Sequence, residues 1–468
     1  MTPYQILWDL PIAATGLSVL LLIVATLQRK ERLLLVTATL ILTNANTAAV
    51  SAITADLGLG LGSASFLMDG VLLVLLWYYR VNPIRVLFPR HGWPGVLLFL
   101  TLCYMLVISP IVSIDRVDTV RRSLSYLLVY ALGWGAFGLI FSHRPELTRE
   151  RVYTILYTGG MWSLVMLFAL LLVAGPHAFR GEIGGLWSTI TLGSITVSQL
   201  QAPGMNATGV AMSAASSVFL IIHLWQMWSR SRLKRLILAA VLFVVTIVFL
   251  WSAGRTAMLA FAGTVILLLL LVTIVRRGKH RFTAVLFLLL LGLALIPLTD
   301  ILAGLFLRGG ASSLLDAFRI SRLDLALKGV SLYRSYLVWG TGPGVLLASY
   351  SAGDIIVESF FIRILIELGA VGGTIYLIAW LTLTYYVIKV DVHYMRLGYP
   401  ATWLPSSFFI FIWVTSPASF GFSIFDGGLA LNLAIAAAAA VEWKRIRDEE
   451  RQRVIQHRKN VSEVMKHA

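Results

Sequence analysis

The chain has almost no cysteine and little charge. Its single cysteine, Cys103, lies within an apolar run, which excludes an intramolecular disulfide and any cysteine-based metal site. Charged residues make up only 13% of the 468 residues, whereas hydrophobic residues make up 58%. Segments of about 20 predominantly apolar residues recur along the chain, as they do in proteins whose solvent is lipid. The composition therefore predicts a polytopic helical membrane protein.

Motifs for nucleotides and metal ions are also missing. The sequence has no G-x-x-x-x-G-K-[ST] loop, no Asp-x-Asp pair, and no histidine in the polar segment from Arg308 to Glu358. Such motifs hold nucleotide phosphates or the metal ions that accompany them. The sequence therefore predicts neither a cofactor nor a metal.

Positive charge is in excess, with 38 Lys and Arg against 22 Asp and Glu. The basic residues gather in short clusters that follow alternate apolar segments, which is the pattern of the positive-inside rule. The clusters are Arg29–Arg32, Arg80–Arg90, Arg144–Arg151, Arg230–Arg235, Arg276–Arg281 and Lys389–Arg396. A membrane explains the net charge of +16 without a polyanion, so nucleic acid is not an expected partner.

Hydropathy predicts an all-α fold, a polytopic transmembrane helical bundle of about 12–14 spans. Thirteen candidate spans cover about residues 5–27, 33–54, 62–79, 93–114, 123–142, 153–174, 205–227, 236–252, 256–275, 282–303, 357–388, 401–418 and 422–442. The charge alternation then places the N-terminus outside, the C-terminus in the cytoplasm, and the longest connections, about 175–204 and 304–356, outside. We therefore divide the chain into a transmembrane domain, residues 1–442, and a charged cytoplasmic tail, residues 443–468.

Arginine is unexpected on the outer side, yet the predicted outer connections carry several. They are Arg116, Arg121, Arg122, Arg180, Arg255, Arg308, Arg319, Arg322 and Arg334, together with Lys328. Snorkelling to lipid phosphates accounts best for those at residues 116, 121, 122 and 308. A functional role is favoured for Arg255, which lies in a tight turn between two apolar spans, and for Arg322.

The second long connection carries paired arginines and a glycine-rich turn. Arg319 and Arg322 lie three residues apart in a segment with helical apolar spacing, so both guanidinium groups face the same way. Such a pair suits phosphate or pyrophosphate oxygens. Arg334 precedes the turn Trp339-Gly340-Thr341-Gly342-Pro343-Gly344, whose glycines permit a close backbone approach. We expect Arg334, Gly342 and Gly344 to contribute to the same binding site.

Two carboxylates lie at or near the start of the eleventh predicted span. Glu358 lies at its mouth and is either a general base or a solvated or ion-paired surface group. Glu367 follows Arg363 by four residues, a spacing that predicts a structural ion pair facing the bundle. Asp426 is a further external carboxylate.

Four segments together resemble one family, the superfamily of O-antigen ligases and O-antigen polymerases, which are bacterial membrane glycosyltransferases. The segments are Pro203–Gly209 with Asn206, Trp251–Ala257 with Arg255, Arg322–Gly344 with the glycine-rich turn, and Glu358–Gly369. The resemblance covers roughly residues 175–375. It rests on the order and spacing of the four segments.

The resemblance implies an inverting, metal-independent transfer from an undecaprenyl-diphosphate-linked oligosaccharide to a sugar hydroxyl, on the outer face of the bacterial inner membrane. Arg255 and Arg322 would stabilise the leaving diphosphate and Glu358 would serve as the base. The residues that would bind the diphosphate or sugar are Arg180, Asn206, Arg319, Arg334, Gly342 and Gly344. The implied partners are the lipid-linked donor and acceptor, membrane lipids and a chain-length regulator protein.

One position departs from the ligases. They carry histidine where this chain has Glu358, which favours a polymerase of O-antigen or exopolysaccharide over a ligase that transfers polysaccharide to lipid A-core. A lipid-linked oligosaccharide flippase or similar transporter is the alternative from another class. Transporters concentrate charge at the membrane midplane on broken helices, whereas these arginines are predicted in the loops outside the membrane core. A purely structural membrane subunit is a further alternative.

Overall fold

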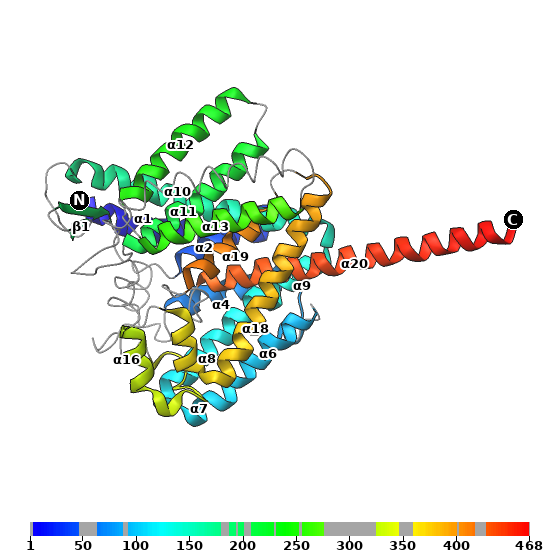
Figure 1. The fold of residues 1–468 in the computed structure, drawn as a ribbon, viewed down its shortest axis with the longest axis horizontal. Coiled ribbons are helices and arrows are strands. Elements are labelled where there is room, and N and C mark those ends of the chain that lie inside the picture. Colours follow the sequence, from blue (N-terminus) through cyan, green and yellow to red (C-terminus); the bar gives the residue numbers. More distant parts are fainter. Residues whose placement is uncertain are drawn as a thin grey trace.

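The computed structural model of this protein consists mainly of helices packed side by side (Figure 1). It describes residues 3–45, 63–87, 92–178, 187–192, 195–200, 207–228, 231–251, 255–275, 324–345, 359–399, 402–416 and 427–467. Among these described residues, five helical segments are long and apolar enough to cross a membrane: Asp9–Leu27, Trp93–Val112, Arg116–His143, Pro145–Val173 and Phe360–Arg396. The predicted helical bundle is confirmed at this level, and its apolar helices are consistent with a membrane-embedded protein.

Helices occupy the predicted spans wherever the structure describes them. The first six spans correspond to α1 (Pro3–Leu27), α2 (Glu31–Asn44), α4 (Ser63–Tyr79), α6 with α7 (Trp93–Cys103, Ser109–Val112), α8 with α9 (Arg116–Tyr130, Phe137–His143) and α10 (Thr148–Ala178). The later ones correspond to α11 (Ala207–Met227), α12 (Arg232–Trp251), α13 (Arg255–Val275), α18 (Phe360–Arg396), α19 (Leu404–Thr415) and α20 (Gly427–His467). The predicted span at 282–303 lies outside the described residues, so the total number of spans stays a prediction.

Short elements connect these helices. They are α5 (Pro83–Leu87), α16 (Asp324–Leu332), the π-helical turns η1 (Tyr104–Ile108) and η2 (Ala131–Ala136), and the 3-10 turns η3 (Pro145–Leu147) and η5 (Arg334–Tyr336). Glycine at η2 allows a close helix contact, since a Cβ on Gly133 would lie 2.4 Å from the carbonyl oxygen of Ala430 in α20. This contact packs the α8–α9 helix against α20.

A two-stranded β-hairpin, which was not predicted from the sequence, accompanies the helices. Strands β1 (Trp187–Leu192) and β2 (Ile195–Leu200) pair antiparallel, with Trp187 opposite Leu200 and Leu192 opposite Ile195. They lie within the connection predicted at 175–204. Both strands are rich in Ile, Thr and Val, which favour extended backbone.

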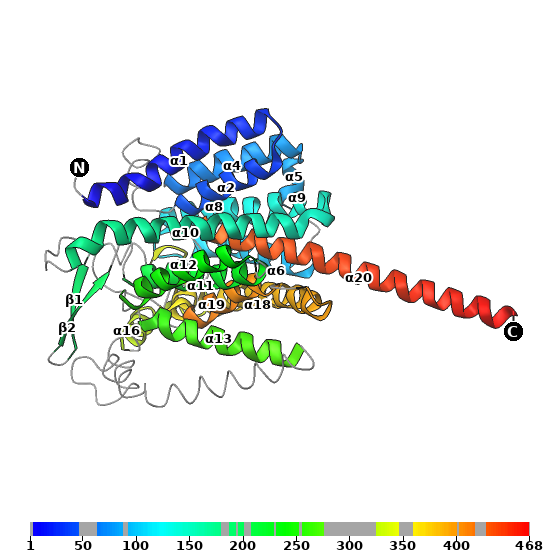
Figure 2. The same ribbon diagram turned by 90° about the horizontal axis from the view of Figure 1, so that it is seen from above.

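Three of the basic clusters, Arg29–Arg32, Arg144–Arg151 and Lys389–Arg396, lie together at one end of the bundle, called here the basic end. Arg151 of α10 pairs with Glu31 of α2 at 2.5 Å, which joins the first basic cluster to the third. The guanidinium carbon of Arg149 lies 3.8 Å from the ring centroid of Tyr394, near the end of α18. The N-terminus, β1, β2 and α16 lie toward the opposite end (Figure 2). Which side of a membrane each end faces stays a prediction.

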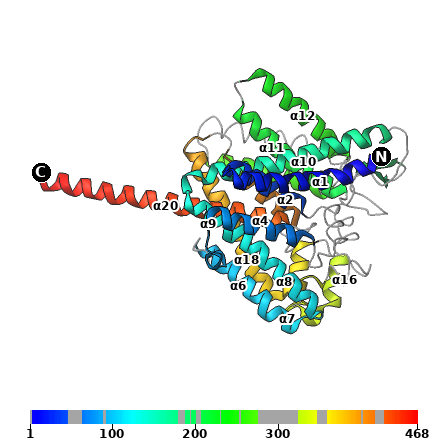
Figure 3. The same cartoon turned by 180° about the vertical axis from the view of Figure 1, so that it is seen from behind.

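The predicted tail continues a helix of the bundle. α20 runs without interruption from Gly427 to His467, and its second half projects beyond the other helices (Figure 3). Its first half is an alanine-rich segment that is buried among the other helices, from Leu433 to Val441. From Lys444 onward most of its described side chains are exposed. The change from buried apolar to exposed charged residues takes place within about one turn.

Candidate functional site

The glycine-rich turn is inserted at a break in α18. Gly369 has φ 68° and ψ 179°, which are not helical values. The backbone beyond the break bonds to the segment before the turn, because Ala370 N–H donates to Leu337 O at 2.7 Å and Val371 N–H donates to Val338 O at 3.2 Å. The turn therefore supplies hydrogen bonds that an unbroken helix would have made within itself.

The carbonyl groups before the break accept hydrogen bonds from the turn itself. Thr341 N–H donates to Ile366 O at 2.8 Å, and Gly342 N–H donates to Glu367 O at 3.0 Å. The Thr341 hydroxyl also donates to Ile366 O, at 3.2 Å. The segments Arg322–Gly344 and Glu358–Gly369 of the family resemblance thus meet in direct backbone contact over their described parts.

Glycine is required in this turn because the chain is both left-handed and closely packed there. Gly340 has φ +85°, and a Cβ on it would lie 2.4 Å from Glu367 O. Gly342 has φ +102°, and a Cβ on it would lie 2.2 Å from the Thr119 hydroxyl. Gly344 has φ +94° and lies against Arg122. Only glycine adopts these backbone angles without strain and leaves room for such neighbours.

A buried ion pair lies directly beneath the turn. Arg363 Nε lies 3.2 Å from Glu367 Oε1, with side-chain exposures of 7% and 0%. The sequence prediction of an i, i+4 pair facing the bundle is therefore confirmed. The backbone of Gly344 also faces the Glu367 carboxylate. Because a charge without a partner is costly at this depth, the pair fixes the first turns of α18 against the glycine turn.

The α7–α8 connection closes the other side of the turn. The Ser113 hydroxyl donates to Thr341 O at 2.8 Å, and Ile114 N–H donates to the same oxygen at 3.2 Å. On α8, Arg122 Nε lies 3.6 Å from Asp118 Oδ2, and the Arg122 side chain is 33% exposed. Arg122 therefore makes an ion pair beside the glycine turn, where the sequence favoured snorkelling to lipid phosphates.

The described residues around the glycine-rich turn include three of the predicted site residues. Gly342 and Gly344 are buried in the turn, and Arg334 begins η5 with an exposed side chain. Arg255 is the first residue of α13. The predicted residues Arg180, Asn206, Arg319, Arg322 and Glu358 lie outside the described residues, as does Asp426. The convergence of Arg255 with Arg322 therefore stays a prediction.

The amide of Gly342 is already engaged by α18, because it donates to Glu367 O. The turn brings the chain from Arg334 to the start of α18 and next to Arg122. Arg334, Arg122 and the Arg363–Glu367 pair lie around the glycine-rich turn. The side chains of Arg122 and Arg334 are accessible to solvent. Arginine at such a position can bind the oxygens of a phosphate or diphosphate.

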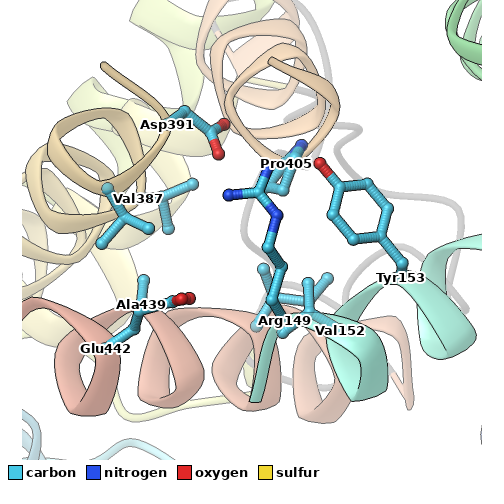
Figure 4. Close-up of a pocket in the computed structure, with 10 residues that line it drawn as sticks. Arg149, Val152, Tyr153, Val387, Asp391, Pro405, Ala439 and Glu442 are labelled. Carbon is cyan, nitrogen blue, oxygen red and sulfur yellow. The ribbon is translucent and has the colours of Figure 1, made fainter. Parts of the chain in front are cut away.

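A second polar cluster lies at the basic end and surrounds Arg149 of α10 (Figure 4). The Arg149 guanidinium lies over the rings of Tyr394, Tyr153 and Tyr399, at 3.8, 5.5 and 5.7 Å from their centroids. Figure 4 shows the guanidinium between Asp391 and Tyr153. The tyrosines thus hold the cation by contact with their ring faces.

Two buried carboxylates complete the second cluster. Asp391 accepts hydrogen bonds from the backbone and the hydroxyl of Ser406, at 2.9 and 2.6 Å. Glu442 accepts a short hydrogen bond from the Tyr394 hydroxyl and lies 3.4 Å from Arg445. The cavity between them and Arg149 is about 30 Å³, enough for a water molecule. Helices α10, α18, α19 and α20 are joined by these contacts.

The second cluster was not predicted from the sequence. Arg149 was assigned to the positive-inside pattern, and Asp391 and Glu442 were given no role. The signal that could have found them is that both carboxylates lie at the ends of predicted apolar helices, where acidic residues are rare and are usually paired. Their partners could not be named, because Ser406 is 15 residues from Asp391 and Tyr394 is 48 residues from Glu442.

No family model matches the chain, and a search of curated proteins finds no match.

Proposed function

We propose that this protein is a membrane glycosyltransferase that polymerises undecaprenyl-diphosphate-linked oligosaccharide units on the outer face of a bacterial inner membrane. The observation that carries the proposal is the meeting of two family-like segments at one end of the bundle. The glycine-rich turn and the start of α18 are bonded to each other, and the segments that hold Arg322 and Glu358 lead into them. Arg122 adds a guanidinium at the same place.

The proposed reaction is a direct displacement. Glu358 takes the proton from a hydroxyl of the acceptor sugar, and that oxygen attacks the anomeric carbon of the donor with inversion. The bond to the prenyl diphosphate breaks, and Arg255 and Arg322 stabilise the negative charge that develops on the leaving group. The donor already carries the driving force in its diphosphate bond, so the proposal requires neither ATP nor a metal.

The arginine role is tested by chain extension with purified protein and a lipid-linked oligosaccharide. Because lysine keeps the charge but not the planar fork, Arg322→Lys should lose most polymer formation and Arg322→Ala all of it. Lys328→Ala is the matched control, since Lys328 is exposed on α16 and should be dispensable. Full activity of the lysine variant would refute a role for the guanidinium geometry. Transfer to lipid A-core in place of chain extension would indicate a ligase.

The base is tested by Glu358→Gln. This variant keeps the shape of the side chain but cannot accept the proton, so extension should fall by about a hundred-fold to ten-thousand-fold. Donor binding should survive, because arginines hold the diphosphate. If Glu358 is only an ion-pair partner, the variant should instead lose stability while its folded fraction extends chains at nearly the normal rate.

A second candidate function is transport of a lipid-linked oligosaccharide. The break at Gly369 beside the buried Arg363–Glu367 pair favours it, since transporters often place charge at broken membrane helices. Liposomes containing the purified protein and a lipid-linked oligosaccharide distinguish the two functions. A transporter moves the substrate between leaflets without lengthening it, whereas a polymerase lengthens it.

A further inference from the structure

A groove of about 370 Å³ lies where α20 leaves the bundle, at the basic end. One wall is formed by Ser142 of α9 and Pro145 of η3. The other is one face of α20, formed by Ala440, Val441, Lys444, Arg445, Asp448, Glu449 and Gln452. These α20 residues follow helical spacing, so they make a continuous stripe. The volume is within the range of small-molecule sites.

The stripe changes character along the helix axis. Ala440 and Val441 are apolar and almost fully buried, so they form the inner floor of the groove. Lys444 and Arg445 follow on the next turn, and Asp448 and Glu449 on the turn after that. Successive turns are about 5.4 Å apart. The order outward from the bundle is therefore apolar, cationic, anionic.

Among the charged residues of the groove, Arg445 is held in place by the second cluster. Arg445 lies 3.4 Å from Glu442, and its Nη2 donates to the Tyr394 hydroxyl at 3.0 Å. Its Nη1 lies 3.5 Å from Glu449, whose side chain is 50% exposed. Lys444 and Asp448 are both exposed. A cationic turn and an anionic turn are thus presented side by side at the level where α20 emerges from its neighbours.

We propose that this groove binds the headgroup of an aminophospholipid, a lipid with a phosphodiester followed by a primary ammonium. Its glycerol and ester groups lie over Ala440 and Val441, its phosphate against Lys444 and Arg445, and its ammonium against Asp448 and Glu449. A purely anionic lipid meets the two carboxylates with no cation of its own. A quaternary ammonium has no N–H to donate to them. The ordered charges of the groove therefore select the zwitterion with a primary amine.

The test is native mass spectrometry of the full chain, delipidated in detergent and titrated with lipids of identical acyl chains. Phosphatidylethanolamine should bind about five-fold more tightly than phosphatidylcholine or phosphatidylglycerol, since an exposed ion pair contributes up to about 1 kcal/mol. The double variant Asp448→Asn, Glu449→Gln should lose this preference. Lys444→Ala should weaken binding of all three lipids, because each carries the phosphate.

Glu450→Gln is the matched control, because Glu450 is exposed on the same helix but does not line the groove. It should bind the three lipids as the unaltered chain does. Equal affinity of the unaltered chain for all three lipids would overturn the proposal. Tighter binding of phosphatidylglycerol would overturn it too, since that result indicates simple attraction of anionic lipid. Retention of the preference by the double variant would exclude the carboxylates as its cause.

Discussion

Replacing Gly340 by alanine tests whether the glycine turn depends on close packing against α18. Gly340 has φ +85°, and a Cβ there would lie 2.4 Å from Glu367 O, 2.6 Å from Leu368 C and 2.7 Å from Gly369 N. All three are backbone atoms, so no side-chain rotation relieves the overlap. The left-handed backbone costs an L-residue about 1–2 kcal/mol. Overlap in a packed interior adds about 1–3 kcal/mol, so we expect a loss of about 2–5 kcal/mol.

Gly398→Ala separates the two contributions. Gly398 has φ +83°, but nothing lies within 4 Å of a Cβ built on it. This variant should therefore lose only the backbone contribution, about 1–2 kcal/mol. The assay is denaturant unfolding of purified protein in detergent micelles, followed by tryptophan fluorescence. Equal loss of unfolding free energy in the two variants would refute the packing argument, because the overlap at Gly340 would then cost nothing.

Three further outcomes are expected. Glu367→Ala leaves Arg363 buried without its carboxylate and should cost about 3–5 kcal/mol, and Arg363→Met in the same chain should restore most of it in the same unfolding assay. Arg149→Met keeps the apolar stem but removes the cation from its three tyrosines, so thermal stability should fall by about 1–2 kcal/mol more than for Arg149→Lys. Arg122→Ala should weaken binding of a prenyl diphosphate, whereas Arg116→Ala, exposed on the same helix, should not; equal affinities in a binding titration contradict this.

The helical bundle could be predicted because each membrane-spanning helix requires a continuous run of apolar residues, which is visible in the sequence. Apolar runs predicted the helices. The alternation of basic clusters predicted that the first and third clusters lie at the same end of the bundle, and the Arg151–Glu31 pair joins these two clusters. The Arg363–Glu367 pair was also predictable, since four residues on a helix define one face. Each of these inferences needs only neighbouring residues.

The rest depends on contacts between distant segments. Gly369 has no sequence feature that marks it as a break, and the break exists because Leu337 and Val338 accept hydrogen bonds from the residues that follow it. The hairpin of β1 and β2 was overlooked although its Ile, Thr and Val content favours strands, because the connection was judged by hydropathy alone. Tyr153 and Tyr394, whose rings contact Arg149 in the second cluster, come from two helices that are far apart in the sequence.

The insertion of the glycine turn into α18 has a consequence for biosynthesis. The Tyr104 hydroxyl donates to Trp339 O at 2.7 Å across 235 residues of sequence. At about 5–20 residues per second, the ribosome reaches Trp339 roughly 10–50 s after Tyr104. During that interval α6 and α8 lack the segment that closes between them, and the half of α18 that completes the closure comes later still. Nascent chains arrested before Gly369 should therefore hold the N-terminal helices but remain sensitive to protease at the α7–α8 connection until synthesis resumes.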